Sequence, residues 1–96
     1  MLFVITAMDI NDGGALRLAT RAAHFEYARE TGVIRLGGPF LDAEGGMIGS
    51  LIIIEAENLE AAKAWTANDP YAKAGVYAHY DVRLWKVTFN PSGAAL

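Results

Sequence analysis

Three polar side chains on one predicted helix are candidates for acid–base chemistry. Residues 15–32 read ALRLATRAAHFEYARETG, and at about 100° per residue Arg17, Arg21 and His24 fall within an arc of about 60°. Apolar side chains flank this arc on both sides, so it is not an ordinary solvated face. Because an unpaired guanidinium is costly to bury, the arc needs acidic partners from the protein or an anionic ligand.

Asp69, within WTANDPY, is the second candidate. On a helix predicted over 58–69 it falls on the same side as Trp65, the side that should face a sheet. A carboxylate at a helix C-terminus opposes the helix dipole, so it needs a donor such as a histidine N–H. A His24–Asp69 pair would fix the imidazole tautomer and leave His24 as a general base. Arg21 would then hold negative charge on a ligand, and Arg17 is expected to contribute only at the surface.

The glycine-rich segments add candidates for a pocket wall. In LGGPF, Gly38 and its neighbour Gly37 allow close approach, and Pro39 removes a ladder donor, as at a strand edge. Ser50, in GGMIGS, lacks the strand-to-helix elbow of a nucleophilic serine, so we expect it to hydrogen-bond a ligand.

Composition limits the possible partners. The 96 residues include 53% hydrophobic and 20% charged residues, which predicts a single domain over 1–89 with a loose tail over 90–96. A net charge of −3 without a basic run argues against nucleic acid. The chain has no cysteine and two histidines without metal-ligand spacing, so neither a metal nor a cofactor is expected. With no leader signal and no bilayer-length apolar run, we expect a cytoplasmic protein without membrane contact.

The elements that must position these residues follow the order βαββαβ. Asp12 and Asn58 are the expected N-caps of the two helices, and Gly32 is the expected stop of the first. The order is typical of the ferredoxin-like α+β fold, a four-stranded antiparallel sheet with two helices on one face. Strands are predicted over 2–8, 33–40, 47–57 and 76–89, helices over 15–32 and 58–69, and a short helical turn over 70–75.

The last predicted strand carries large apolar side chains on both faces. Leaving Tyr77, Trp85 and Phe89 in water would create an apolar patch of the size that marks an interface. We therefore expect a homodimer in which two sheets pack together through their open faces.

Several of these motifs together resemble one known family. The combination of Arg-x-x-x-Arg-x-x-His, Gly-Pro, Asp-Pro-Tyr and Ala-Gly-Val-Tyr, from FVITAMD to KVTF, is similar to the YCII-related, or YciI-like, family of small proteins. The resemblance implies a dimeric α+β barrel of ferredoxin-like subunits with a small polar cleft near a histidine–aspartate pair. By motif, the pair falls on His24 and Asp69. The cleft-lining positions fall on Arg21, Gly38, Pro39, Ser50 and Tyr71.

A characterised branch of that family resembles a dehydrochlorinating lyase that acts on a chlorinated hydroxylated aromatic. The leading hypothesis is therefore a cofactor-independent enzyme of the lyase or isomerase type, in which His24 takes a proton from a small anionic or phenolic molecule. Two other hypotheses stay open. The cleft could belong to a non-catalytic dimeric module that binds a small acid, or the pair could be a buried brace with nothing bound.

Overall fold

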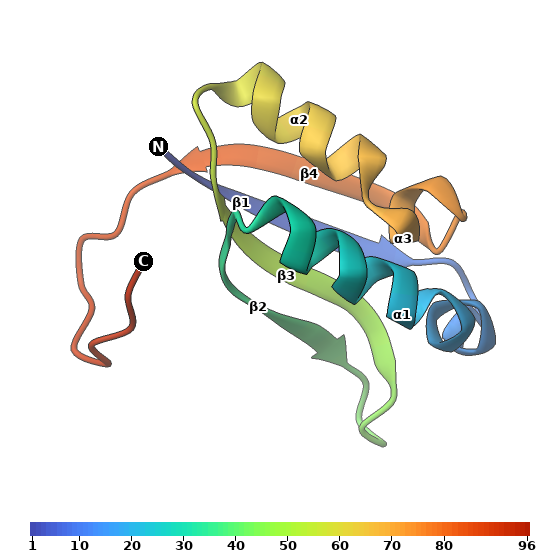
Figure 1. The fold of residues 1–96 in the computed structure, drawn as a ribbon. Helices are drawn as coiled ribbons and strands as arrows, with labels where there is room; N and C mark the ends of the chain where they lie inside the picture. Colours follow the sequence, from blue (N-terminus) through green and yellow to red (C-terminus); the bar gives the residue numbers. More distant parts are fainter.

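A four-stranded antiparallel sheet forms one layer of the molecule, and two helices cover one of its faces (Figure 1). The computed structural model describes all residues 1–96. The strands lie in the order β2-β3-β1-β4, so the first and third strands are central. This topology confirms the predicted ferredoxin-like α+β fold. The elements are β1 (Leu2–Asp9), α1 (Gly14–Thr31), β2 (Ile34–Leu41), β3 (Met47–Glu55), α2 (Leu59–Asn68), α3 (Pro70–Lys73) and β4 (Tyr77–Trp85).

The main core lies between α2 and the two central strands. Alternate residues of a strand point to opposite faces, and on β1 Phe3 and Ile5 point toward the helices. The antiparallel register places Ile54 opposite Phe3, so the same face of β3 is apolar as well. Ala62 and Trp65 of α2 pack on this surface and complete the cluster.

Local signals set most of the helix ends. Gly32 ends α1 in the left-handed conformation at φ 64°, which glycine adopts without a steric penalty. Asn58 caps α2, because its side chain accepts a hydrogen bond of 2.8 Å from the Ala61 N–H. Both predictions are confirmed. The prediction of Asp12 as the cap of α1 is wrong: Gly13 holds the N-cap position, and Asp12 turns the chain at φ 56°.

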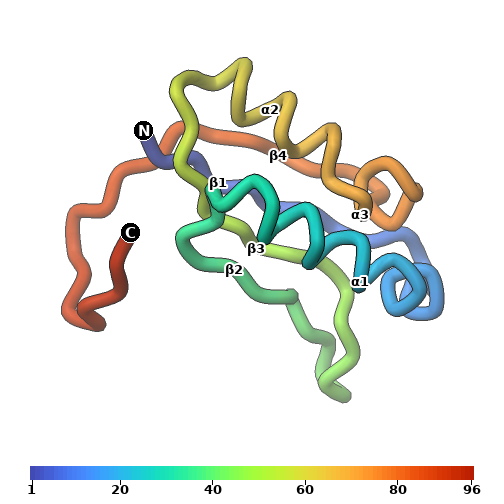
Figure 2. The backbone as a smooth tube through the Cα atoms, in the orientation of Figure 1, coloured from blue at the N-terminus to red at the C-terminus, as the bar shows by residue number.

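The fourth strand differs from its predicted pattern at both ends. Pairing between β1 and β4 shifts by one residue between Met8 and Asp9, and this irregularity turns Tyr77 toward the helices, where it is buried. Sequence alternation alone leaves open which side of this strand faces the helices, and the structure places Tyr77 on the helix side, away from Trp85. Trp85 ends the strand, so Phe89 lies beyond it and is 87% exposed. Figure 2 shows the chain leaving the sheet after β4 and folding back as a loop.

The opposite face of the sheet carries no helix (Figure 1). None of the helices is both long enough and apolar enough to span a membrane.

Candidate functional site

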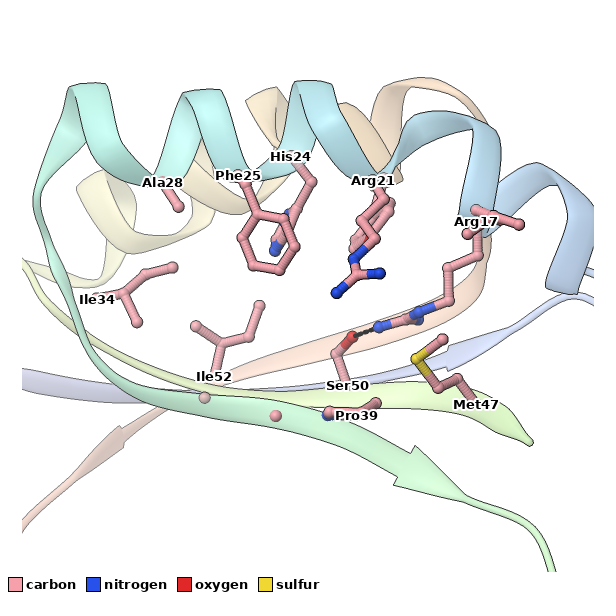
Figure 3. Close-up of a pocket in the computed structure, with 14 residues that line it drawn as sticks. Arg17, Arg21, His24, Phe25, Ala28, Ile34, Pro39, Met47, Ser50 and Ile52 are labelled. Carbon is pink, nitrogen blue, oxygen red and sulfur yellow. Dashed lines mark hydrogen bonds between the residues drawn. The ribbon is translucent and has the colours of Figure 1, made fainter. Parts of the chain in front are cut away.

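A pocket of about 280 Å³ lies between α1 and the strands β2 and β3 (Figure 3). Its wall on α1 includes Arg17 and His24, the two buried side chains of that helix. Ser50 and Ile52 of β3 lie on the opposite side, and Pro39 of the edge strand β2 borders them. The buried positions of α1 thus carry a guanidinium and an imidazole, while apolar residues of the same helix also line the pocket.

His24 and Asp69 are in direct contact within this region. His24 Nδ1 and Asp69 Oδ1 lie 2.8 Å apart, and both side chains are buried. An ionised carboxylate can only accept, so the proton of this hydrogen bond sits on Nδ1. Nε2 is then the free ring nitrogen of a side chain that borders the pocket, which is the arrangement a general base requires.

The end of α2 explains how Asp69 reaches this position. Pro70 disfavours helical geometry in the preceding residue, and Asp69 is extended at φ −61° and ψ 129°. Its side chain caps α3 by accepting from the Tyr71 N–H at 3.0 Å, and it also accepts from the Tyr77 hydroxyl at 3.4 Å. Burial, followed by the charge of Asp69, raises the pKa of Tyr77 well above its usual range. The phenol therefore stays a donor to the carboxylate.

Tyr71 contacts both members of the pair. Its ring stacks on the His24 imidazole with centroids 4.1 Å apart and planes inclined by 13°, while its backbone N–H binds Asp69. Burial raises the pKa of the Tyr71 phenol, and the Arg17 charge opposes this shift. The ring fixes one face of the imidazole, so the orientation of His24 is set by both stacking and hydrogen bonding.

Arg17 is an interior residue, and the prediction that it contributes only at the surface is wrong. It is 5% exposed, and its Nη1 donates to the two carboxylate oxygens of Asp9 at 3.0 and 2.9 Å. Its Nη2 donates to Ser50 Oγ at 2.7 Å. The sheet thus supplies the acidic partner that the polar arc needs. One signal in the sequence could have located it, because strand alternation places Asp9 on the same face as Phe3 and Ile5.

Arg21 differs from Arg17 in having no carboxylate partner. Its guanidinium lies 5.4 Å from the centre of the Phe25 ring and extends into the pocket from an exposed position on α1 (Figure 3). It is therefore the unpaired cation of the site. The other candidates predicted to line a cleft, Gly38, Pro39, Ser50 and Tyr71, all border this pocket. Asp69 is not one of the pocket-lining residues and contacts His24.

Known proteins are similar to this chain in sequence and in fold. Residues 1–86 match the family model of the YCII-related domain. The chain is 39% identical to Protein YciI of Escherichia coli O6:H1, over 93% of this chain and 100% of that protein. It is 40% identical to an uncharacterized protein of Haemophilus influenzae with the same coverage.

A solved structure gives a similar result. It is that of the 5-chloro-2-hydroxyhydroquinone dehydrochlorinase TftG from Burkholderia phenoliruptrix AC1100, in complex with 2,5-dihydroxybenzoquinone. It superposes with a TM-score of 0.82 at 36% sequence identity, over 90% of this chain and 94% of that chain. Sequence, fold and family model agree, and the chain belongs to the YCII-related family.

Proposed function

We propose that this protein is a cofactor-independent enzyme of the lyase or isomerase type, with His24 as its general acid–base. One observation carries the proposal: a buried histidine whose Nδ1 donates to Asp69 leaves its other ring nitrogen free in a pocket that also holds an unpaired arginine. In this role Asp69 orients His24, and Arg21 stabilises negative charge as the proton leaves.

The pocket favours a single small ring as the substrate. At about 280 Å³ it lies just below the usual range for small-molecule sites. One part of its wall is apolar, with Ile34 and Ile52, and another is polar, with Arg21 and Ser50. A planar ring with oxygen substituents along one edge matches this division. The hydroxylated quinone bound by TftG is a molecule of this class.

Loss of HCl from a chlorinated trihydroxybenzene needs only proton transfers and the departure of chloride. Two hydroxyl protons leave, one proton is delivered to the ring carbon that bears chlorine, and chloride departs with the C–Cl electron pair. The products are a hydroxyquinone and HCl, so no oxidant or reductant is consumed. A histidine that accepts a hydroxyl proton and returns one to carbon is sufficient for these transfers, and Arg21 would stabilise the intermediate enolate.

The test is a turnover assay with 5-chloro-2-hydroxyhydroquinone, in which chloride release and quinone absorbance are followed. His24→Asn keeps a side chain of similar polarity but removes the base, so we expect turnover to fall by about 10²- to 10⁴-fold. His79→Asn is the matched control, because His79 is the other histidine and lies exposed on β4. It should match the wild type.

Two outcomes would redirect the proposal. Equal turnover in His24→Asn and the wild type would remove His24 from the chemistry. If the wild type releases no chloride but the ring compound shifts the NMR signals of pocket residues and is recovered unchanged, the protein is a small-molecule-binding module.

We also infer a homodimer through the helix-free face of the sheet. Leu36 is 49% exposed and Trp85 38% exposed on that side, and Val4 and Leu51 point the same way by strand alternation. Sedimentation equilibrium of Leu51→Glu tests this inference. We expect a folded monomer, whereas Ala67→Glu on the exposed side of α2 should sediment like the wild type. An unchanged mass for Leu51→Glu would place the interface elsewhere.

A further inference from the structure

The burial of Arg17 is not explained by ligand binding. Both terminal nitrogens of its guanidinium are engaged, one with Asp9 and the other with Ser50, although the side chain borders the pocket. The Asp9 carboxylate also neutralises its charge at 2.9 Å. A cation held in this way is a poor anchor for an anionic substrate, a role that the unpaired Arg21 fills better.

The aromatic ring of Tyr71 connects Arg17 to the His24–Asp69 pair. Its guanidinium carbon lies 4.7 Å from the centre of the Tyr71 ring, and that ring stacks on His24 at 4.1 Å. Arg17 and His24 are two helical turns apart, or about 10.5 Å along the axis, so Tyr71 bridges the interval between them. Tyr71 also donates its N–H to Asp69. A shift of the guanidinium would therefore move the ring that touches both members of the pair.

Arg17 also holds the Ser50 hydroxyl. Ser50 Oγ accepts from Arg17 at 2.7 Å, which leaves the Ser50 hydroxyl proton free to be donated. Ser50 borders the same pocket as Tyr71, and the Tyr77 hydroxyl separately donates to Asp69 Oδ2 at 3.4 Å. Arginine can only donate and an ionised aspartate can only accept, so Arg17 fixes the Ser50 oxygen and Asp69 fixes the Tyr77 hydroxyl.

We propose that Arg17, fixed by Asp9, is a positioning residue for the His24–Asp69 pair. It holds the Tyr71 ring in the place from which the stack on His24 and the Tyr71 N–H to Asp69 orient the imidazole and the carboxylate. Its effect on the chemistry is indirect, and its removal should change the tautomer and orientation of His24 before any substrate is bound.

The first measurement is ¹⁵N NMR of the imidazole nitrogens in the full-length, ligand-free protein. Arg17→Lys keeps the positive charge but loses the planar fork that reaches both Asp9 and Ser50. We expect the Nδ1–H signal of His24 to move and broaden as the two tautomers mix, while His79 stays unchanged. Arg29→Lys is the matched control, because Arg29 lies on the same helix in an exposed pair with Glu26. It should leave the His24 signals as in the wild type.

The second measurement is kinetic and rests on the proposed function, whereas the NMR result does not. If the enzyme turns over 5-chloro-2-hydroxyhydroquinone, Arg17→Lys should lower kcat by about 10- to 100-fold with little change in KM, as expected for a misplaced catalytic group. A missing activity in the wild type would defeat the proposed function but leave the positioning role to the NMR experiment.

Two results would overturn the positioning role. Unchanged His24 signals in Arg17→Lys, or an increase in KM at constant kcat, would make Arg17 a structural or ligand-binding cation. Should Arg17→Lys fail to fold, the double variant Asp9→Leu with Arg17→Met replaces the buried ion pair by apolar side chains of comparable size. Unchanged His24 signals in that folded variant would also reject the proposal.

Discussion

The two long helices cover the same sheet but meet it in opposite ways. Under α2 the interface is apolar, with Ala62 and Trp65 packed on Phe3 and Ile54. Under α1 the buried side chains are Arg17 and His24, and a pocket separates the helix from β2 and β3. One half of the fold therefore supplies most of the hydrophobic stabilisation, while the other half can hold polar groups because each buried charge there has a partner.

We expect the largest loss of stability from a substitution in the apolar interface under α2. Trp65→Ala removes the largest side chain of the α2 interface, and we expect the free energy of unfolding to fall by about 3–5 kcal/mol. Phe25→Ala on α1, where the ring is 46% exposed, should cost less than about a third of that amount. Urea unfolding followed by circular dichroism measures both. Equal losses would mean that α1 contributes as much packing as α2.

For the ion pair under α1, we expect the loss of one charged side chain to cost more stability than the replacement of both. Asp9→Ala leaves the Arg17 guanidinium buried without its carboxylate, which should destabilise the fold by about 3 kcal/mol. In Asp9→Leu with Arg17→Met both charges are absent, and we expect most of that stability to return. A double variant as unstable as the single one would indicate that the polar groups themselves stabilise this half, and a thermal unfolding series would reveal it.

Substitutions at the N-termini of the two helices should have smaller effects on stability. Asn58→Ala removes the cap of α2 and should cost about 1 kcal/mol. At the corresponding position of α1, serine is normally a better cap than glycine, yet a Cβ on Gly13 would lie 2.9 Å from the Ile10 carbonyl oxygen. We therefore expect Gly13→Ser to destabilise the protein by a similar amount, about 1 kcal/mol. A gain in the denaturation midpoint of Gly13→Ser would show that the loop before α1 can relax.

The smallest effect is confined to alkaline pH. Burial raises the pKa of Tyr71 and Tyr77 in the site above the ordinary tyrosine value of about 10. The folded protein then binds these phenolic protons more tightly than the unfolded chain does, so the stability they contribute is present below about pH 10 and is lost as the pH rises further. Tyr77→Phe should flatten the dependence of unfolding free energy on pH above about pH 10. A curve parallel to that of the wild type would contradict this linkage.

The sequence was sufficient for those features that depend on local order. The succession of strands and helices predicts the sheet and its two helices, and Gly32 and Asn58 mark helix ends through their own backbone and side-chain preferences. The inward orientation of Asp69 also follows from helical periodicity next to a proline.

Features that depend on which strands pair could not be found in this way. The buried position of Tyr77 results from the shifted pairing of β4 with β1, and no pattern within residues 76–89 encodes that shift. The interior position of Arg17 depends on two partners from other elements. Strand alternation alone could indicate Asp9, but a separate hairpin brings Ser50 to the same place.

Asp69 ends α2, caps α3 and holds His24. A substitution there is therefore selected against on two grounds at once, loss of folding and loss of the pair. The rim of the pocket has no such double duty, because Gly38, Pro39 and Met47 are exposed residues outside the main core. Substitutions at the rim can therefore accumulate while the His24–Asp69 pair is retained. Related proteins can then bind different ligands with the same fold.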